Sequence, residues 1–115
     1  MYIEYQVFKL AGVYFEGKEV KINYQHAFEL YNYCLEDICI ENNRNVIEKY
    51  DVLISIIKEE DSTYFGNPDY QQCVLIARRI GWMLYTGNGV EKDETIGIEL
   101  LNAVKEIKIE EQCPF

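Results

Sequence analysis

Apolar residues recur near the start of the chain with the period of an amphipathic helix. They fall at i, i+4, i+7, i+8 and i+11: Ile3, Val7, Leu10, Ala11 and Tyr14. A second stripe of the same kind follows: Ala27, Leu30, Tyr31, Cys34 and Ile38. Between the stripes, Gly17 suits a helix C-terminus that needs positive φ, and Asn23 is a good N-cap. Residues 3–38 are therefore predicted to form helix, turn, helix.

The same pattern returns 70 residues later. Its first stripe is Cys73, Ala77, Ile80, Gly81 and Leu84. Its second is Gly97, Leu100, Leu101, Val104 and Lys108, which lapses at the last position. Gly87 and Asp93 stand where Gly17 and Asn23 stood, and Asn67-Pro68 is a cap followed by a first-turn proline. We interpret residues 3–38 and 68–107 as two copies of one internal repeat.

A third apolar stripe lies between the copies: Val46, Tyr50, Leu53, Ile54 and Ile57. It predicts a helix from about Asn43 to Glu59, without the glycine turn of the two copies. Three acidic residues at its C-terminal end, Glu59, Glu60 and Asp61, oppose the helix dipole and favour termination before a loop. Because no period-two strand pattern is present, we predict one all-α domain spanning residues 1–115.

The turn of the second copy carries a recognisable motif. It reads Ile80-Gly81, Met83, Gly87-x-Gly89-Val90 and Lys92-Asp93. This motif resembles the Sel-one-like repeat, a relative of the tetratricopeptide repeat. The first copy is similar, with Ala11 for the first glycine and Glu19 for the later one. The second copy has Leu84 where the family has Tyr and Gly97 where it has Ala.

The resemblance implies a right-handed helical-repeat array that presents a surface to other proteins and has no enzymatic activity. Units of this kind recur every ~34 to 40 residues. Here the spacing is nearly double, so the helix at 43–59 occupies the place of one unit. We therefore expect a compact body of about five helices.

Net charge narrows the choice of partner. The chain has 115 residues, 20 acidic against 11 basic side chains, and a formal charge of −9 that both halves share. Such a charge repels phosphate, which argues against nucleic acid and anionic membranes as partners. A basic protein is the natural complement.

Candidate chemistry is sparse. His26 is the one histidine, expected near the start of a helix, and no nucleophile, phosphate or dinucleotide motif is present. The four cysteines form no C-x-x-C pair: Cys34, Cys39, Cys73 and Cys113. With a single histidine they predict no zinc site, and we expect reduced thiols that fill core space, with a redox or disulfide role as the alternative. We therefore predict no catalytic residue, cofactor or metal. The chain shows no signal peptide or membrane span, so we expect a cytoplasmic protein.

Tyrosine is abundant, with ten in the chain. Tyr14, Tyr31 and Tyr50 lie on the stripes and are expected in the core. Five others lie off the stripes and are candidates for the surface: Tyr5, Tyr24, Tyr33, Tyr64 and Tyr70. The adjacent aromatics Tyr64 and Phe65 stand in a polar loop, so they either tuck inward or form a binding hot spot.

We therefore predict a partner-binding site made of Glu59, Glu60, Asp61, Tyr64 and Phe65. The first functional hypothesis is a non-enzymatic protein–protein interaction module. The alternative is a small acidic immunity or antitoxin-type protein of bacteria. Such a protein would neutralise a cationic toxin, such as a nuclease, by covering its active-site cleft.

Overall fold

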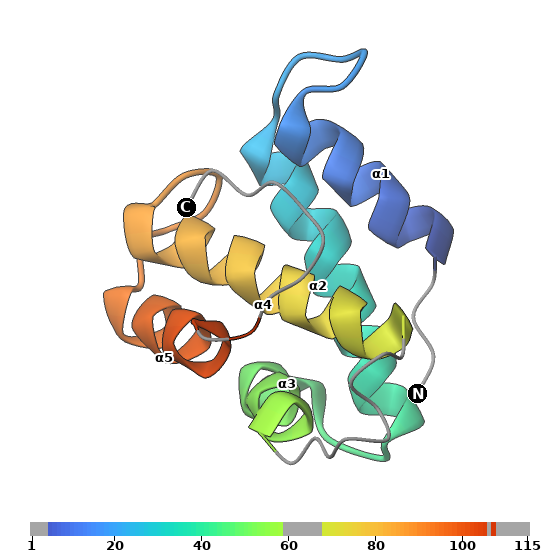
Figure 1. The fold of residues 1–115 in the computed structure, drawn as a ribbon, viewed down its shortest axis with the longest axis vertical. Coiled ribbons are helices and arrows are strands. Elements are labelled where there is room, and N and C mark those ends of the chain that lie inside the picture. The colour runs from blue at the N-terminus through green and yellow to red at the C-terminus, as the bar shows by residue number, and fades with distance from the viewer. Residues whose placement is uncertain (1–4, 59–67, 106, 108–115) are drawn as a thin grey trace.

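Two helical hairpins and a separate helix between them make up the fold (Figure 1). The computed structural model describes residues 5–58, 68–105 and 107. In chain order the elements are α1 (Tyr5–Glu16), α2 (Tyr24–Glu41), the 3₁₀ helix η1 (Val46–Glu48), α3 (Lys49–Lys58), α4 (Pro68–Thr86) and α5 (Glu94–Val104). The described residues contain no strand, so the predicted all-α class is confirmed for them.

Helix α4 holds the body together. It pairs with α5 in the second hairpin and also contacts α2 of the first hairpin and α3. In Figure 1 it lies at the centre of the view, between α2 and α5, with α3 below it. The body measures 37 × 27 × 27 Å along its principal axes.

The first helix of each hairpin, α1 and α4, ends in the same way. Gly17 has φ 74° and Gly87 has φ 78°, the left-handed conformation that glycine adopts without strain. The N–H of Gly17 donates to the carbonyl oxygen of Val13 at 2.9 Å, and the N–H of Gly87 donates to that of Met83 at 2.8 Å. These bonds satisfy carbonyls at the ends of α1 and α4, as the sequence predicted.

The hairpins also enter their second helices alike. Asn23 and Asp93 are the N-caps, each with φ −143°. The side chain of Asn23 accepts from the N–H of His26 at 3.0 Å. That of Asp93 accepts from the N–H of Ile96 at 3.2 Å. Both caps were predicted from the residue types, and both lie just before the helix that they start.

The two turns carry different residue types at a position that is left-handed in both. Gly89 has φ 82°, and Glu19, seventy residues earlier, has φ 64°. Gly89 also packs tightly against the first hairpin, because a Cβ there would lie 2.6 Å from the main-chain nitrogen of Gln25. The glycine is needed for that contact as well as for its φ. Glu19 adopts the same left-handed conformation, which residues other than glycine rarely adopt.

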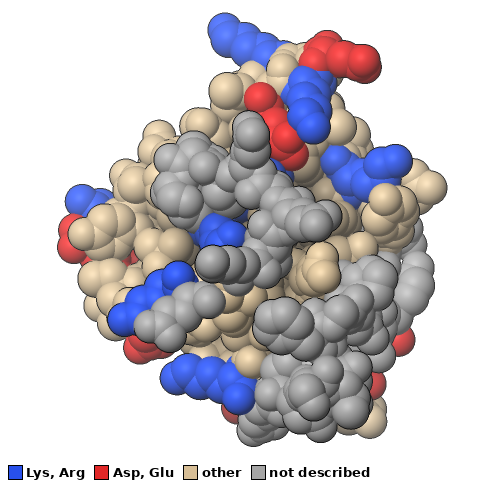
Figure 2. Space-filling model, viewed as in Figure 1, with Lys and Arg blue, Asp and Glu red and all other residues tan. Residues whose placement is uncertain are grey.

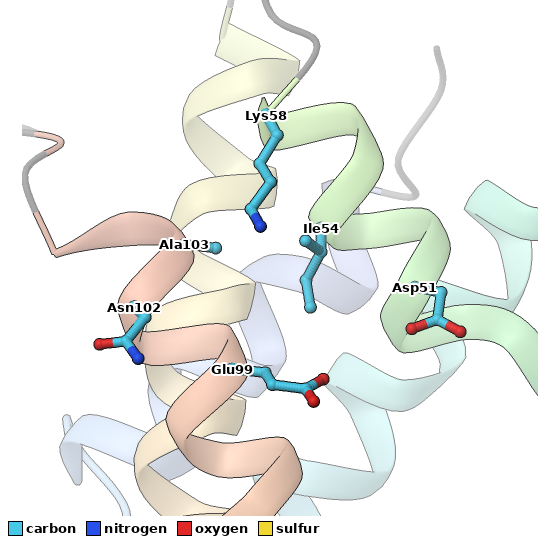
Figure 3. Close-up of a pocket in the computed structure, with 6 residues that line it drawn as sticks. All are labelled: Asp51, Ile54, Lys58, Glu99, Asn102 and Ala103. Atoms are coloured by element: carbon cyan, nitrogen blue, oxygen red, sulfur yellow. The ribbon is translucent and has the colours of Figure 1, made fainter.

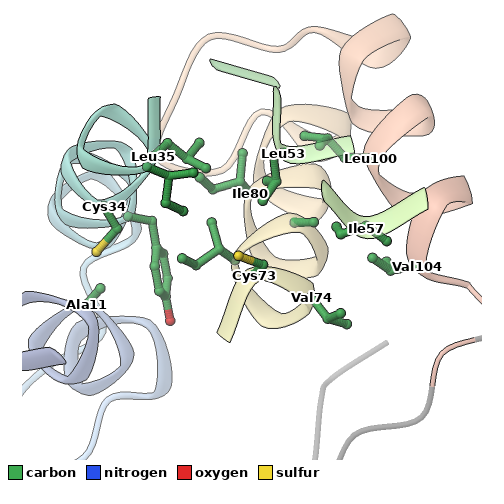
Figure 4. Close-up of a cluster of buried hydrophobic side chains, with 14 of the residues drawn as sticks. Ala11, Cys34, Leu35, Leu53, Ile57, Cys73, Val74, Ile80, Leu100 and Val104 are labelled. Atoms are coloured by element: carbon green, nitrogen blue, oxygen red, sulfur yellow. The ribbon is translucent and has the colours of Figure 1, made fainter. Parts of the chain in front are cut away.

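Side chains from every α-helix converge on one apolar core (Figure 4). Members labelled in the figure include Ala11, Cys34, Leu35, Leu53, Ile57, Cys73, Val74, Ile80, Leu100 and Val104. The stripe predicted for α4 is buried at all five positions: Cys73, Ala77, Ile80, Gly81 and Leu84. Gly97, Leu100 and Val104 of the α5 stripe are buried too, whereas Lys108 lies outside the described residues.

The stripe predicted for α1 is confirmed in part: Ala11 is buried, and Val7 and Tyr14 pack against the core. Leu10 was expected in the core but is 44% exposed, whereas Phe15, off the stripe, is only 3% exposed. The reason is the second hairpin: Trp82 of α4 lies edge-to-face with Phe15, at 5.7 Å between ring centroids. Trp82 therefore covers the Phe15 side of α1, while Leu10 lies on an uncovered side.

The middle helix starts later than predicted. We expected it from Asn43, but α2 continues to Glu41, and Asn43 adopts φ 55°, which no right-handed helix contains. The side chain of Asn45 then accepts from the N–H of Ile47 at 2.9 Å and caps η1. Regular α-helix begins only at Lys49, and α3 is described as far as Lys58, so the predicted end at Glu59 lies outside the described residues.

Candidate partner-binding site

All five residues of the predicted site lie outside the described residues. Glu59, Glu60, Asp61, Tyr64 and Phe65 belong to the interval 59–67, between the end of α3 and the start of α4. Nothing in the fold therefore tests that site, and it stays a prediction.

Only some of the tyrosines predicted at the surface are exposed. Tyr5 and Tyr33 are exposed, as expected. The surface prediction is wrong for Tyr70, which lies on α4, is only 4% exposed and belongs to the core. Tyr24 is half-buried, with its ring edge-to-face with that of Trp82 at 5.2 Å. The surface prediction failed there because α4 covers the start of α2.

The expected core tyrosines are also only partly as predicted. Tyr31 is fully buried, while Tyr14 and Tyr50 are half-buried and pack against the core. Burial raises the pKa of the Tyr50 phenol, and the nearby carboxylate of Asp93 raises that pKa further.

A groove opens between α3 and α5 (Figure 3). Its volume is about 410 Å³, and the residues that line it are Asp51, Ile54, Lys58, Glu99, Asn102 and Ala103. The α3 residues are spaced i, i+3 and i+7, and the α5 residues i, i+3 and i+4, so each set lies on one face of its helix. Parallel positioning of the two helices brings the two faces together.

The groove is electrically polar along its length. Figure 3 shows the carboxylates of Asp51 and Glu99 toward one end and the ammonium of Lys58 toward the other, with Ile54 between them. None of these three charged side chains makes an ion pair or hydrogen bond within the described part of the chain. The groove could not be predicted from the sequence, because the lining residues of α3 and those of α5 become neighbours only after folding.

A second cavity, of about 290 Å³, lies between the first hairpin and α4. Arg79 lies against it and is only 1% exposed. Its guanidinium donates to the hydroxyl of Tyr31 at 2.8 Å and to Glu16 Oε2 at 3.2 Å, and lies 4.6 Å from the ring centre of Phe15. Burial acts to raise the pKa of the Glu16 carboxyl, but the hydrogen bond from Lys18 and the charge of Arg79 outweigh it and lower that pKa. We assign these contacts to joining the hairpins.

The remaining titratable groups make local contacts. His26 Nδ1 lies 3.4 Å from Glu29 Oε1, one turn along α2, and its ring lies edge-to-face with Tyr14. Cys34, Cys39 and Cys73 are buried thiols, in agreement with the core role predicted for them, and burial raises the pKa of the Cys39 thiol. Cys113 lies outside the described residues. Over the described ranges, no three side chains of His, Cys, Asp or Glu are grouped so that they could hold a metal ion.

Charges on the visible surface are mixed. Figure 2 shows acidic and basic side chains interspersed around the rim of one face, outside the area that the undescribed residues cover. No helix among the described residues has the length and apolar character needed to cross a membrane. Comparisons with protein-family models, curated proteins and solved structures find no match for this chain.

Proposed function

We propose that this chain is a non-enzymatic protein–protein interaction module of the Sel-one-like repeat type, a right-handed helical-repeat array that binds a basic protein partner. One observation supports the repeat above all. The N–H of Asn23 donates to the carbonyl oxygen of Tyr14 at 2.9 Å, and the N–H of Asp93 donates to that of Leu84 at 2.8 Å. The bonds that close the two hairpins are thus the same, seventy residues apart.

Exposed apolar residues favour a binding role. Ile47 is 85% exposed and Ile40 is 65% exposed, on either side of the connection between α2 and α3, with Val46 also exposed beside Ile47. Exposed apolar side chains of this size are candidates for contact with another protein. The net charge of −9 favours a basic partner.

Crosslinking and affinity capture from the native host, with mass spectrometry of the captured protein, would identify the partner. The purified pair should then associate more slowly as salt rises from about 50 to 500 mM, because screening weakens long-range attraction. A partner that is acidic, or an association rate that ignores salt, would contradict the proposal. Turnover of a small substrate by the chain would contradict its non-enzymatic part.

Two sets of substitutions test the site predicted from the sequence. Charge reversal of Glu59, Glu60 and Asp61 is expected to slow association with that partner, because it removes electrostatic steering. Tyr64→Ala and Phe65→Ala are expected to speed dissociation, because aromatic anchors act mainly after contact is made. Unchanged rates in both sets would remove this segment from the binding site.

A narrower role is favoured by the carboxylates of Asp51 and Glu99, which have no ion-pair partner among the described residues. An immunity or antitoxin-type protein would use such charges against the phosphate-binding cleft of a cationic toxin, for example a nuclease. If the captured partner is a nuclease, one equivalent of this chain should abolish its activity. Binding that leaves the nuclease active would exclude this role and leave the general module.

A further inference from the structure

We infer that the α3–α5 groove is the docking site of the basic partner, and that it takes one arginine or lysine side chain of that partner between Asp51 and Glu99. This inference rests on the proposed function and names the residues of this chain that recognise the partner. The helices that line the groove, its apolar floor and its charged side chains all belong to the described residues.

The two helices that line the groove are anchored in the core. On the faces opposite the groove, α3 buries Val52, Leu53 and Ile57, and α5 buries Leu100 and Val104. The groove walls are therefore held by core packing, and their side chains project from regular helix rather than from loops. A site so placed is organised before the partner arrives, which lowers the entropic cost of binding.

Several carboxylates of the described chain lie beside a basic side chain. Glu16 pairs with Arg79 at 3.2 Å, Glu48 with Arg44 at 3.8 Å and Glu94 with Lys92 at 3.0 Å.

By contrast, Asp51 and Glu99 have no such partner within the described part of the chain. They project from different helices toward the same end of the groove, as Figure 3 shows. Two like charges that share a groove repel each other, and a cation placed between them relieves that repulsion.

The floor of the groove suits the stem of a basic side chain. Ile54 and Ala103 are half-buried and line the space beyond the carboxylates. Lysine and arginine lay their methylene stems along apolar surface while the charged head reaches polar groups. A sodium ion or other small cation would leave this apolar floor uncovered.

Lys58 sets the direction of the occupant. Its ammonium lies toward the end of the groove opposite the carboxylates and has no ion-pair partner in the described ranges. A second basic residue would be repelled there, whereas a backbone carbonyl or a carboxylate of the partner would be bound. The groove therefore fits a segment that carries its basic residue toward Asp51 and Glu99 and an acceptor toward Lys58.

A peptide titration tests the groove without the partner in hand. The probe is a blocked pentapeptide of glycine and serine with a central arginine, added at millimolar concentration to the ¹⁵N-labelled full chain. We expect the largest amide shifts at Ile54, Asn102 and Ala103. Peptides with glutamine or glutamate in place of arginine should leave these amides unshifted.

A matched pair of variants separates the groove from general charge. Asp51→Asn with Glu99→Gln is expected to weaken the arginine peptide by about fivefold, because two exposed ion pairs are lost. Glu19→Gln with Glu91→Gln removes the same charge from two carboxylates in the hairpin turns and should leave binding unchanged. Equal weakening in both variants, shifts centred elsewhere, or the same shifts with calcium chloride would overturn the inference.

The partner, once captured, separates this inference from the proposed function. Capture that is strong with the wild-type chain and at least about fivefold weaker with the Asp51→Asn, Glu99→Gln variant supports both. Equal capture by the two chains overturns the groove as docking site while the interaction function stands. Specific binding of the arginine peptide in a chain that captures no protein supports the groove chemistry and overturns the interaction function.

Discussion

Arg79 and Tyr31 meet in the interior, where the guanidinium donates to the tyrosine hydroxyl over 2.8 Å. The two residues are 48 positions apart and belong to different hairpins, Tyr31 to α2 and Arg79 to α4. Arg79 also reaches Glu16 at the end of α1. One buried cation thus ties both helices of the first hairpin to the second, and its loss should be felt as a loss of stability.

Arg79→Met is expected to lower the free energy of unfolding by about 3 kcal/mol, since removal of a buried partner strands the groups that it bonded. Tyr31→Phe should cost about 1 kcal/mol alone and clearly less when Arg79 is already Met. Urea unfolding of the two single variants and the double variant measures this coupling. Lys105→Met, at an exposed lysine, is the control, and additive effects at Arg79 and Tyr31 would contradict a direct bond between them.

Glu19→Gly is expected to stabilise the chain by roughly 0.5–1 kcal/mol, since glycine adopts its φ of 64° without a steric penalty. The gain is partly offset by the greater freedom of glycine in the unfolded chain. Glu91→Gly, in the other turn at a residue without positive φ, should instead be neutral or destabilising. Thermal unfolding decides the sign, and a loss of stability in Glu19→Gly would contradict the strain assigned to this turn.

Gly89→Ala should destabilise the chain by about 3 kcal/mol, because it combines a strained φ with a clash. The new methyl would press on the main chain at Tyr24 and Gln25, which belongs to the other hairpin. Gly12→Ala is the opposite case: its Cβ would lie 3.4 Å from Glu16 Oε2 within a helix. That variant should be neutral or stabilising by up to about 1 kcal/mol in denaturant unfolding, and a similar loss in both would refute the packing assigned to Gly89.

The Glu16 carboxyl, whose pKa is lowered in the folded chain, makes stability depend on pH in a defined direction. A lowered folded pKa contributes stability that is present above the unfolded pKa, about 4.3, and lost as pH falls through the folded value. Glu16→Gln should therefore flatten the acid side of the stability curve. Urea unfolding between about pH 2 and 6 measures this. Glu91→Gln, in the second turn, should keep the wild-type profile, and an unaltered curve in Glu16→Gln would contradict the ion pair with Arg79.

Helix positions and caps followed from local pattern. The α4 stripe and the N-caps Asn23 and Asp93 lie where periodicity and residue type placed them. These features depend on near neighbours along the chain, which a sequence displays directly. The late start of α3 was missed because the left-handed conformation of Asn43 is one that asparagine can adopt without being obliged to do so.

Features that depend on contact between two helices could not be predicted from the sequence in the same way. Phe15 rather than Leu10 is buried on α1, because Trp82 covers that side, and Tyr70 is in the core for the same kind of reason. The α3–α5 groove is lined by both Asp51 and Glu99, which lie 48 residues apart in the sequence. No periodicity within one helix reports which of its faces another helix will cover.

By itself, then, the amino-acid sequence determined the helical class, the two glycine turns with their caps, and the acidic charge, because each depends on residue type and local spacing. Tertiary structure alone decided which face of α1 is buried, that Arg79 joins the two hairpins, and that the carboxylates of Asp51 and Glu99 share one groove. Those outcomes depend on how helices pack against one another, and packing is decided by the shapes of all the contacting surfaces at once.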